Sequence, residues 1–99
     1  MYSLPDLAKV EGFEWDPANT LKNWRRHKVA FQECEEVFLR APVILPDTEH
    51  SITEPRFYAF GKTLAERRLT ITFTLRKNKI RVISARPASR KERNIYEEI

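Results

Sequence analysis

The sequence predicts an α+β fold: a small antiparallel sheet with two N-terminal helices and one C-terminal helix, in the order β-α-α-β-β-β-β-α. In the first half, apolar residues recur three and four positions apart, as on one face of a helix. In the second half, short strand patterns follow one another. Helices gathered before and after a run of strands are typical of an antiparallel sheet with helices on one face. We expect one domain over residues 1–99, with residues 1–11 as a lead-in of unassigned structure.

The composition is that of a folded, basic protein. Apolar residues make up 41% and aromatic residues 11% of the chain, which is enough for a packed core. There are 18 Lys and Arg against 14 Asp and Glu, so the net charge of +4 is compatible with a polyanionic partner. The single cysteine, Cys34, excludes an intramolecular disulfide and supplies no metal cluster. We expect Cys34, Trp15 and Trp24 to lie in the core.

The sequence does not predict export or a membrane span. Its beginning, MYSLPDLAKVEGF, lacks a positively charged head and an apolar stretch, so we do not expect a signal peptide. Nowhere does an apolar run approach the roughly 20 residues that a membrane-spanning helix needs. We therefore expect a cytoplasmic protein without a membrane partner.

Two consecutive helices are predicted between residues 16 and 39. Asp16 is a good N-cap, because its carboxylate can accept from the free N–H groups of the first turn. Pro17 suits the first helical position, and this helix should end near Lys28. The second helix covers residues 30–39. Its apolar stripe contains Phe31, Cys34, Val37 and Phe38.

Five strand segments and a third helix complete the predicted elements. The strands cover residues 12–15, 43–45, 56–60, 69–76 and 80–85. The fourth of these, LTITFTLR, is the clearest, because apolar and polar residues alternate strictly. A polar loop of ten residues, 46–55, is long enough to be functional or mobile. Ser89 and Glu92 have capping-box spacing, which predicts a terminal helix containing Arg93 and Tyr96.

The last two strands are predicted to form a hairpin, and its register decides where the arginines point. A three-residue loop at 77–79 pairs Arg76 with Ile80, Thr74 with Val82, Thr72 with Ser84, and Thr70 with Arg86. One exposed face then carries threonine, serine and arginine, and the other carries the apolar core. Arg81 falls at the margin of the core face, opposite to Arg86, so these two arginines are not expected to serve one site.

The polar face has two interpretations. The planar fork of an arginine suits phosphate, and hydroxyl groups can add contacts to phosphate or sugar, so Arg76 and Arg86 indicate nucleic-acid binding. Alternatively, a threonine-rich solvent face is normal for an antiparallel sheet, and an arginine at a strand end often forms only a salt bridge. The pattern alone leaves both open.

Several short motifs occur in order along the chain. The first half contains FEWDP (13–17), Asn23 followed by RRH (25–27), and Phe31, Glu35 or Glu36, Val37 and Phe38. The second half contains DTEHSITEPRF (47–57), Gly61, the TxR of residues 74–76, RVISAR (81–86), and Glu92, Arg93 and Tyr96. In combination these motifs resemble the BrnT family, the toxins of bacterial type II toxin–antitoxin systems. The resemblance extends from about residue 13 to the C-terminus.

The resemblance implies a compact RelE-like fold and a metal-independent endoribonuclease, without a cofactor, that cuts RNA and arrests translation. It also implies a cognate antitoxin of the BrnA type with a ribbon-helix-helix DNA-binding end. The complex of the two proteins would bind operator DNA and repress its own operon. The chain departs from the family where glycine and serine are common, at Lys28 and Ala30, and its lead-in is longer. These departures concern the turn between the two helices, and with it the position of His27.

RNA cleavage without a metal requires a base for the 2′-OH proton, positive charge for the phosphorane-like transition state, and an acid for the leaving 5′-oxygen. The expected products are a 2′,3′-cyclic phosphate and a 5′-OH. The predicted catalytic residues are His27, Glu54, Arg76 and Arg86. The predicted RNA-binding residues are Arg56, Thr72, Ser84, Arg93 and Tyr96. His50 is a weaker candidate.

Each assignment has a structural alternative. His27 would cap its helix, Glu54 would pair with a neighbouring arginine, and Tyr96 would pack the terminal helix on the sheet. The alternative function is a basic module that binds nucleic acid or protein without catalysis. Such a module would bind RNA with a steep salt dependence and produce no new RNA ends.

Overall fold

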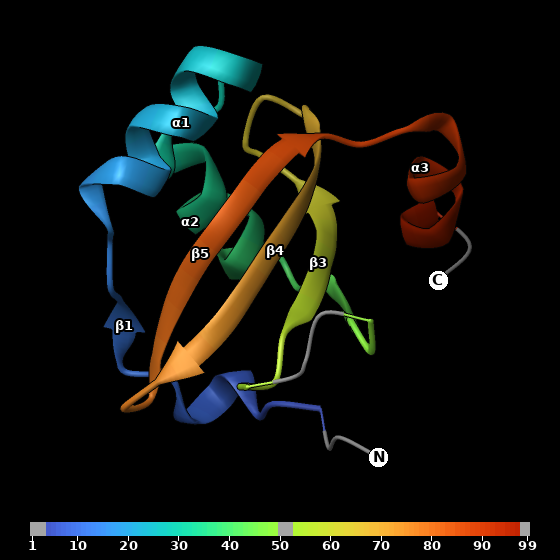
Figure 1. Cartoon of the computed structure of the whole chain (residues 1–99). Coiled ribbons are helices and arrows are strands. Elements are labelled where there is room, and N and C mark those ends of the chain that lie inside the picture. The colour runs from blue at the N-terminus through green and yellow to red at the C-terminus, as the bar shows by residue number, and fades with distance from the viewer. Residues whose placement is uncertain (1–3, 50–52, 98–99) are drawn as a thin grey trace.

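The computed structural model describes residues 4–49 and 53–97, and it confirms the α+β fold (Figure 1). The lead-in contributes a short 3-10 helix that the sequence did not predict. The elements are η1 (Leu7–Lys9), β1 (Gly12–Phe13), α1 (Pro17–His27), α2 (Phe31–Leu39), β2 (Val43–Pro46), β3 (Phe57–Lys62), β4 (Arg68–Arg76), β5 (Lys79–Pro87) and α3 (Arg90–Glu97).

The five strands form one sheet in the order β1-β5-β4-β3-β2. Strands β2, β3, β4 and β5 pair with one another in antiparallel fashion, as predicted. Strand β1 instead runs parallel to β5, with Gly12 beside Lys79 and Phe13 beside Ile80. The sheet is therefore mixed rather than wholly antiparallel. Two helices and three strands separate β1 from β5, so no tight hairpin forces these two strands into opposite directions.

The β4–β5 turn is shorter than predicted. Lys77 and Asn78 have φ angles of 52° and 63°, and two positive φ angles in a two-residue loop match the right-handed twist of a hairpin. Arg76 consequently pairs with Lys79, and Thr74 pairs with Arg81. The predicted pairs Arg76–Ile80 and Thr74–Val82 are wrong by one residue.

A β-bulge restores the predicted register in the second half of the hairpin. Phe73 pairs with Val82, whereas Thr72 pairs with Ser84, so Ile83 is an extra residue in β5. The predicted pairs Thr72–Ser84 and Thr70–Arg86 are confirmed. Because side chains alternate along a strand, the extra residue brings Arg81 to the same face as Arg86. The prediction that they lie on opposite sides is therefore wrong.

The two faces of the sheet differ in character. Helix α2 lies on the apolar side, where Phe38 meets Phe73 edge-on with ring centroids 5.0 Å apart, and α1 lies beside β5 (Figure 1). Cys34 is buried there, as predicted, and burial raises the pKa of its thiol to about 12. We call the opposite surface the polar face. It carries Thr70, Thr72, Thr74, Arg76, Arg81, Ser84 and Arg86.

Helix α1 covers the part of the β5 edge that β1 leaves unpaired. Its first turn is capped as predicted, since Asp16 accepts from the N–H groups of Ala18 and Asn19. The buried Asn23 Oδ1 accepts the Ala85 N–H at 3.2 Å, in place of a neighbouring strand. Nearby, Lys22 Nζ donates to the Ile83 carbonyl at the bulge. Helix α1 thus provides hydrogen-bond partners for the Ala85 N–H and the Ile83 carbonyl, two β5 backbone groups at the edge of the sheet.

Helix α3 is held on the polar face chiefly by the carboxylate of Glu92, and an ion pair between Arg68 and Glu97 adds a second link to the sheet. Both Glu92 oxygens accept from the Arg86 guanidinium, at 2.6 and 2.7 Å. The same side chain accepts from the Thr70 hydroxyl at 3.0 Å and the Ser89 N–H at 2.8 Å, and Ser89 Oγ accepts from the Glu92 N–H. The predicted capping box is therefore confirmed. These donors, Arg86 foremost, lower the pKa of Glu92 to about 2.

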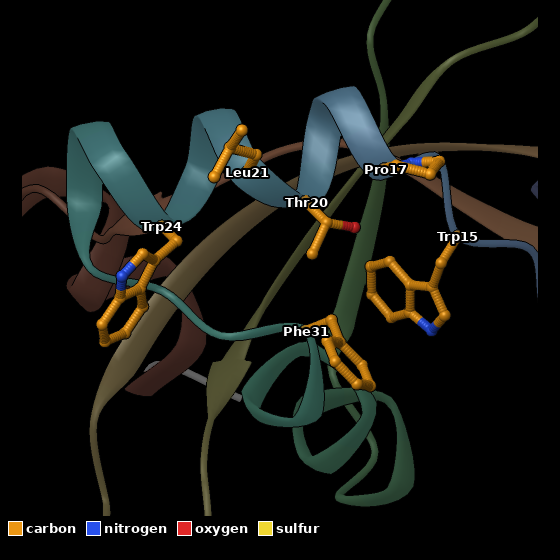
Figure 2. Close-up of a pocket in the computed structure, with 6 residues that line it drawn as sticks. All are labelled: Trp15, Pro17, Thr20, Leu21, Trp24 and Phe31. Atoms are coloured by element: carbon orange, nitrogen blue, oxygen red, sulfur yellow. The ribbon is translucent and has the colours of Figure 1, made fainter.

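One of the two tryptophans departs from its predicted place. Trp15 is half-buried, and its ring stacks on Phe13 with centroids 5.7 Å apart. Trp24 is 48% exposed and points toward the space between α1 and α2 (Figure 2). The prediction that Trp24 lies in the core is therefore wrong. Helix α1 lies along the edge of the sheet, and the residue that it buries against β5 is Asn23.

Replacing Asn23 with alanine should lower the free energy of unfolding by about 1–3 kcal/mol, because the Ala85 N–H would be left without its acceptor. Urea unfolding followed by circular dichroism measures this change. The control is Arg26→Ala, at an exposed position of the same helix, which should unfold at the wild-type urea concentration. Identical midpoints for the Asn23 variant and the wild type would show that the bond contributes no stability.

Glu92→Gln should make the fold less sensitive to acid. The folded-state pKa of Glu92 lies near 2, below its ordinary value of 4.5, so the ionised carboxylate stabilises the folded state above about pH 4.5. That stabilisation is lost as the pH falls from about 4.5 to about 2. The drop in unfolding free energy between about pH 7 and pH 3 should be smaller in the variant, by on the order of 1 kcal/mol. Exposed Glu11→Gln should retain the wild-type drop; an equal drop in the Glu92 variant would contradict the prediction.

Candidate active site on the polar face

A row of hydroxyl groups crosses the polar face near the end of β5. Tyr58, Thr72 and Ser84 are paired across β3, β4 and β5. Arg86 lies in the next row, two residues further along β5, which corresponds to roughly 7 Å. A guanidinium group, a phenol and two small hydroxyl groups are therefore gathered on one surface.

Tyr58 is a candidate that the sequence-based prediction missed. Burial, followed by the charge of Asp47 and a hydrogen bond with it, raises the pKa of Tyr58, and the charge of Arg86 partly opposes this shift. Asp47 is itself buried, and its N–H donates to the Arg56 carbonyl at 2.9 Å. The phenol is therefore protonated at neutral pH and can donate a proton. The sequence signal that could have identified Tyr58 is the alternation in the strand FYAFGK, which puts Tyr58 on the face opposite to Phe57 and Ala59.

The predicted catalytic residue Arg86 is oriented by Glu92. Their hydrogen bonds are the main cause that raises the pKa of Arg86, and both ends of the planar group are engaged. A bidentate pair of this kind fixes the plane of the guanidinium. Because a guanidinium has five N–H donors, the two that Glu92 binds leave further donors for a phosphate.

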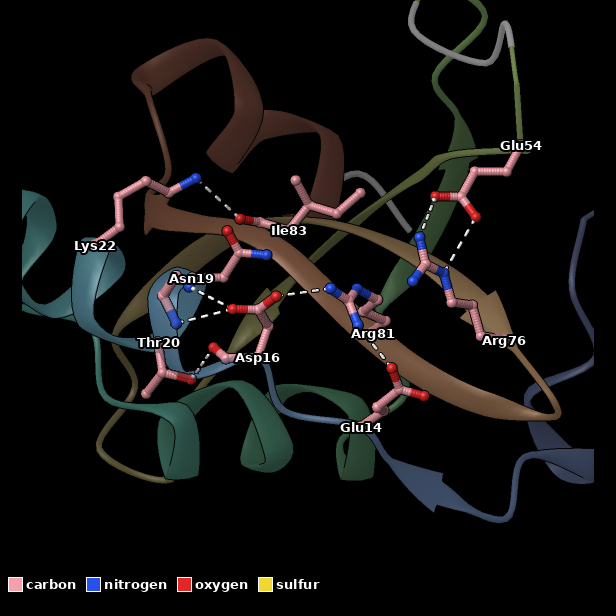
Figure 3. Close-up of polar contacts among 10 residues, drawn as sticks. Glu14, Asp16, Asn19, Thr20, Lys22, Glu54, Arg76, Arg81 and Ile83 are labelled. Carbon is pink, nitrogen blue, oxygen red and sulfur yellow. Dashed lines mark hydrogen bonds and ion pairs between the residues drawn. The ribbon is translucent and has the colours of Figure 1, made fainter.

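Arg76 and Glu54 lie at the far end of the polar face (Figure 3). The Arg76 guanidinium donates to both Glu54 oxygens, at 3.1 and 3.3 Å, and this pairing raises the pKa of Arg76. Along β4, Arg76 is six residues from Thr70, the partner of Arg86, which corresponds to about 20 Å. The structure therefore does not bring the predicted residues Arg76 and Arg86 to the same phosphate.

Arg81 occupies the middle of the polar face and binds two carboxylates. Its guanidinium donates to Glu14 at 2.6 Å and to Asp16 at 2.7 Å (Figure 3). The pKa of Asp16 is lowered first by the N–H groups of Asn19 and Ala18 and then by Arg81. Arg81 thus connects β5 to the start of α1. The sequence could not reveal this role, since the bulge that turns Arg81 to this face leaves no motif.

The polar face is less open than predicted. Thr70 and Thr74 are both buried. Helix α3 covers Thr70 through Glu92, and the Thr74 hydroxyl donates to the Pro55 carbonyl at 2.7 Å. The half-buried residues Thr72 and Ser84 remain as the hydroxyl groups in the middle of the face.

His27 ends α1 at the same end of the sheet as Arg86. It lies one turn after Asn23, which contacts Ala85. The His27 carbonyl accepts from Arg67 Nη2 at 2.9 Å, and Arg67 belongs to the β3–β4 connection. The following Lys28 adopts the left-handed conformation, with φ of 53°, which explains why glycine is favourable there. The next helix keeps a cap, because Glu33 accepts the Ala30 N–H.

The remaining predicted residues are distributed around the face. Arg56 immediately precedes β3, and Arg93 is exposed on α3. Arg93 lines a hollow of about 200 Å³. The other residues that line it are Arg68, Arg90, Asn94 and Glu97. The Tyr96 side chain and the whole of His50 lie outside the described part of the chain.

Residues 4–49 and 53–97 contain no group of three or more His, Cys, Asp or Glu side chains placed to hold a metal ion. Within the same ranges, none of the helices combines the length and apolar character that crossing a membrane requires.

Comparisons with known proteins agree on one family. Residues 15–92, well over half of the chain, match the family described as ribonuclease toxin, BrnT, of type II toxin-antitoxin system. The crystal structure of the Brucella abortus ribonuclease toxin BrnT superposes with a TM-score of 0.63 and 21% identity, over 80% of this chain and 97% of that one, and so shows the same fold. Curated protein sequences give no match. The chain therefore belongs to the BrnT family of type II ribonuclease toxins, a membership that implies an RNA substrate and an antitoxin partner.

Proposed function

We propose that this chain is a metal-independent endoribonuclease that cuts RNA at the Arg86 end of the polar face. The observation that carries the proposal is the placement of the oriented Arg86 guanidinium one row from Tyr58, Thr72 and Ser84. This arrangement supplies positive charge, a protonated phenol and hydroxyl groups on the surface of a protein whose family is a ribonuclease toxin.

Arg86 stabilises the transition state. When the 2′-oxygen attacks phosphorus, negative charge builds up on the non-bridging phosphate oxygens. A guanidinium whose plane is already fixed by Glu92 needs little reorganisation to meet that charge. The hydroxyl groups of Thr72 and Ser84 bind the neighbouring sugar or phosphate.

Two further residues move protons. His27 accepts the 2′-OH proton, since histidine exchanges protons near neutral pH. The new bond between the 2′-oxygen and phosphorus forms as the bond from phosphorus to the 5′-oxygen breaks. Tyr58 donates its proton to the leaving 5′-oxygen, and solvent then carries the proton held by His27 back to the Tyr58 phenolate. The products are a 2′,3′-cyclic phosphate and a 5′-OH.

The rest of the face binds the RNA strand on either side of the cleaved bond. Arg76, with Glu54 as its orienting partner, lies about 20 Å from the Arg86 row and binds a flanking phosphate rather than the cleaved one. Arg56 and Arg93 bind further phosphates, and Tyr96 stacks on a base.

Cleavage of cytoplasmic RNA by this site inhibits translation. The cognate antitoxin is of the BrnA type, with a ribbon-helix-helix end, and neutralises the toxin. The complex of the two proteins binds operator DNA and represses the operon. Type II membership supports this part of the proposal by implying an antitoxin.

Arg86→Ala should reduce RNA cleavage on the order of a hundredfold and remove growth inhibition. The matched variant is Glu92→Gln, which keeps the guanidinium but loses the ion pair that fixes its plane, and it should lose clearly less activity than Arg86→Ala does. Purified proteins are incubated with a long RNA and the new ends are analysed. Equal losses in both variants would show that Arg86 serves only to hold α3. A wild-type chain that binds RNA but makes no 2′,3′-cyclic phosphate ends would favour the non-catalytic module.

Tyr58→Phe and His27→Gln should each lower the cleavage rate, roughly by a hundredfold, and change its pH profile in opposite ways. Loss of the base removes the fall in rate on the acid side, whereas loss of the acid removes the fall on the alkaline side. Single-turnover cleavage rates across pH test both assignments. If His27→Gln keeps the wild-type rate and profile, the histidine is structural, and the same outcome for Tyr58→Phe would exclude the phenol as the acid.

A further inference from the structure

An apolar groove lies between α1 and α2, away from the polar face (Figure 2). Its volume is about 470 Å³. The groove is lined by Trp15, Pro17, Thr20, Leu21, Trp24 and Phe31. Leu21 is 47% exposed, and Phe31 is exposed too, so large apolar side chains face solvent together. A contiguous surface of this kind on a small protein indicates an interaction site.

The walls of the groove are held in place by contacts beneath them. The Trp15 ring lies 5.4 Å from that of Phe31, and its indole N–H donates to Glu35 at 3.0 Å. The polar atom of Trp15 is thus satisfied within the protein, which leaves its ring to face a ligand. Lys28 Nζ lies 5.2 Å from the Trp24 ring and contacts its face. The groove is therefore preformed rather than created by a partner.

Positive charge borders the groove on one side. A neighbouring hollow of about 320 Å³ shares Leu21 with the groove and is also lined by Lys22, Arg25 and Arg26. Both arginines are exposed, and within the described residues neither forms an ion pair. Leu21 therefore separates an aromatic surface from a basic one. A ligand that lies across Leu21 contacts the aromatic rings of the groove on one side and the guanidinium groups of Arg25 and Arg26 on the other.

We propose that this groove seats an acidic amphipathic helix of the antitoxin. Apolar side chains one helical turn apart would enter between Leu21, Trp24 and Phe31, as in other complexes where a helix lies in a groove. Carboxylates on the adjacent flank of that helix would pair with Arg25 and Arg26. The partner's identity rests on the assignment of this chain as a type II toxin; the chemistry of the ligand rests on the groove itself.

Two other occupants fit less well. In a symmetric dimer of this chain, the same patch meets itself, which would bring the Arg25 and Arg26 side chains of both copies together. For RNA, the hydroxyl-rich surface near Arg86 is the better match, since Leu21 and Pro17 offer the groove no polar contact to a sugar or phosphate.

The test measures antitoxin affinity and RNA cleavage on the same set of full-length variants. The probe is the small antitoxin encoded beside this toxin, titrated in solution. Leu21→Ala and Trp24→Ala should each weaken binding by about tenfold to a hundredfold. Leu64→Ala removes a leucine that is 71% exposed outside the groove and should bind as the wild type does. Arg25→Glu combined with Arg26→Glu should weaken binding and reduce its salt dependence. The three alanine variants, at Leu21, Trp24 and Leu64, should cleave RNA at the wild-type rate when the antitoxin is absent.

Wild-type antitoxin affinity in both groove variants would overturn the proposal. So would a dimer of the isolated chain that Trp24→Ala dissociates, because the groove would then be occupied by a second copy. A loss of RNA affinity with unchanged antitoxin affinity would assign the groove to RNA. If the wild-type chain cleaves no RNA, the affinity results still decide the occupant of the groove, so the two proposals fail separately.

Discussion

The extra residue in β5 determines what the polar face carries. In a regular strand, Arg81 and Arg86 would point to opposite sides, because five positions separate them. The bulge at Ile83 turns both arginines to one face while Ile80, Val82 and Ala85 remain in the core. The same irregularity meets α1, whose Lys22 binds the Ile83 carbonyl. One extra residue in β5 therefore decides which arginines share the polar face, and it also provides a carbonyl that α1 binds.

The arginines Arg76, Arg81 and Arg86 of the polar face each have a carboxylate partner. Arg76 pairs with Glu54, Arg81 with Glu14 and Asp16, and Arg86 with Glu92. These partners hold the guanidinium groups in defined orientations, and they also lower the net positive charge that a polyanion meets. Such a face favours precise placement of a few phosphates over strong, unspecific attraction to any nucleic acid. The exposed Arg25 and Arg26 lie elsewhere, beside the apolar groove.

Local rules predicted much of the fold. The cap at Asp16, the alternation of β4 and the capping box of Ser89 and Glu92 each depend on near neighbours in sequence, and each was confirmed. The parallel β1–β5 pair, the bulge and the exposure of Trp24 depend on contacts between distant segments, which periodicity does not encode. For the same reason, the sequence indicated Arg86 but neither Tyr58 beside it nor the distance that separates it from Arg76.

We propose that RNA is cut at the Arg86 end of the polar face. The most direct test is an NMR titration with an RNA oligonucleotide that carries a 2′-deoxy sugar at the cleaved position, so that it binds without reacting. If RNA binds there, the largest shifts should occur at the backbone amides of Thr72, Ser84 and Arg86, with weaker shifts toward Arg76. Shifts confined to the Arg76 end, or to the groove between α1 and α2, would contradict it.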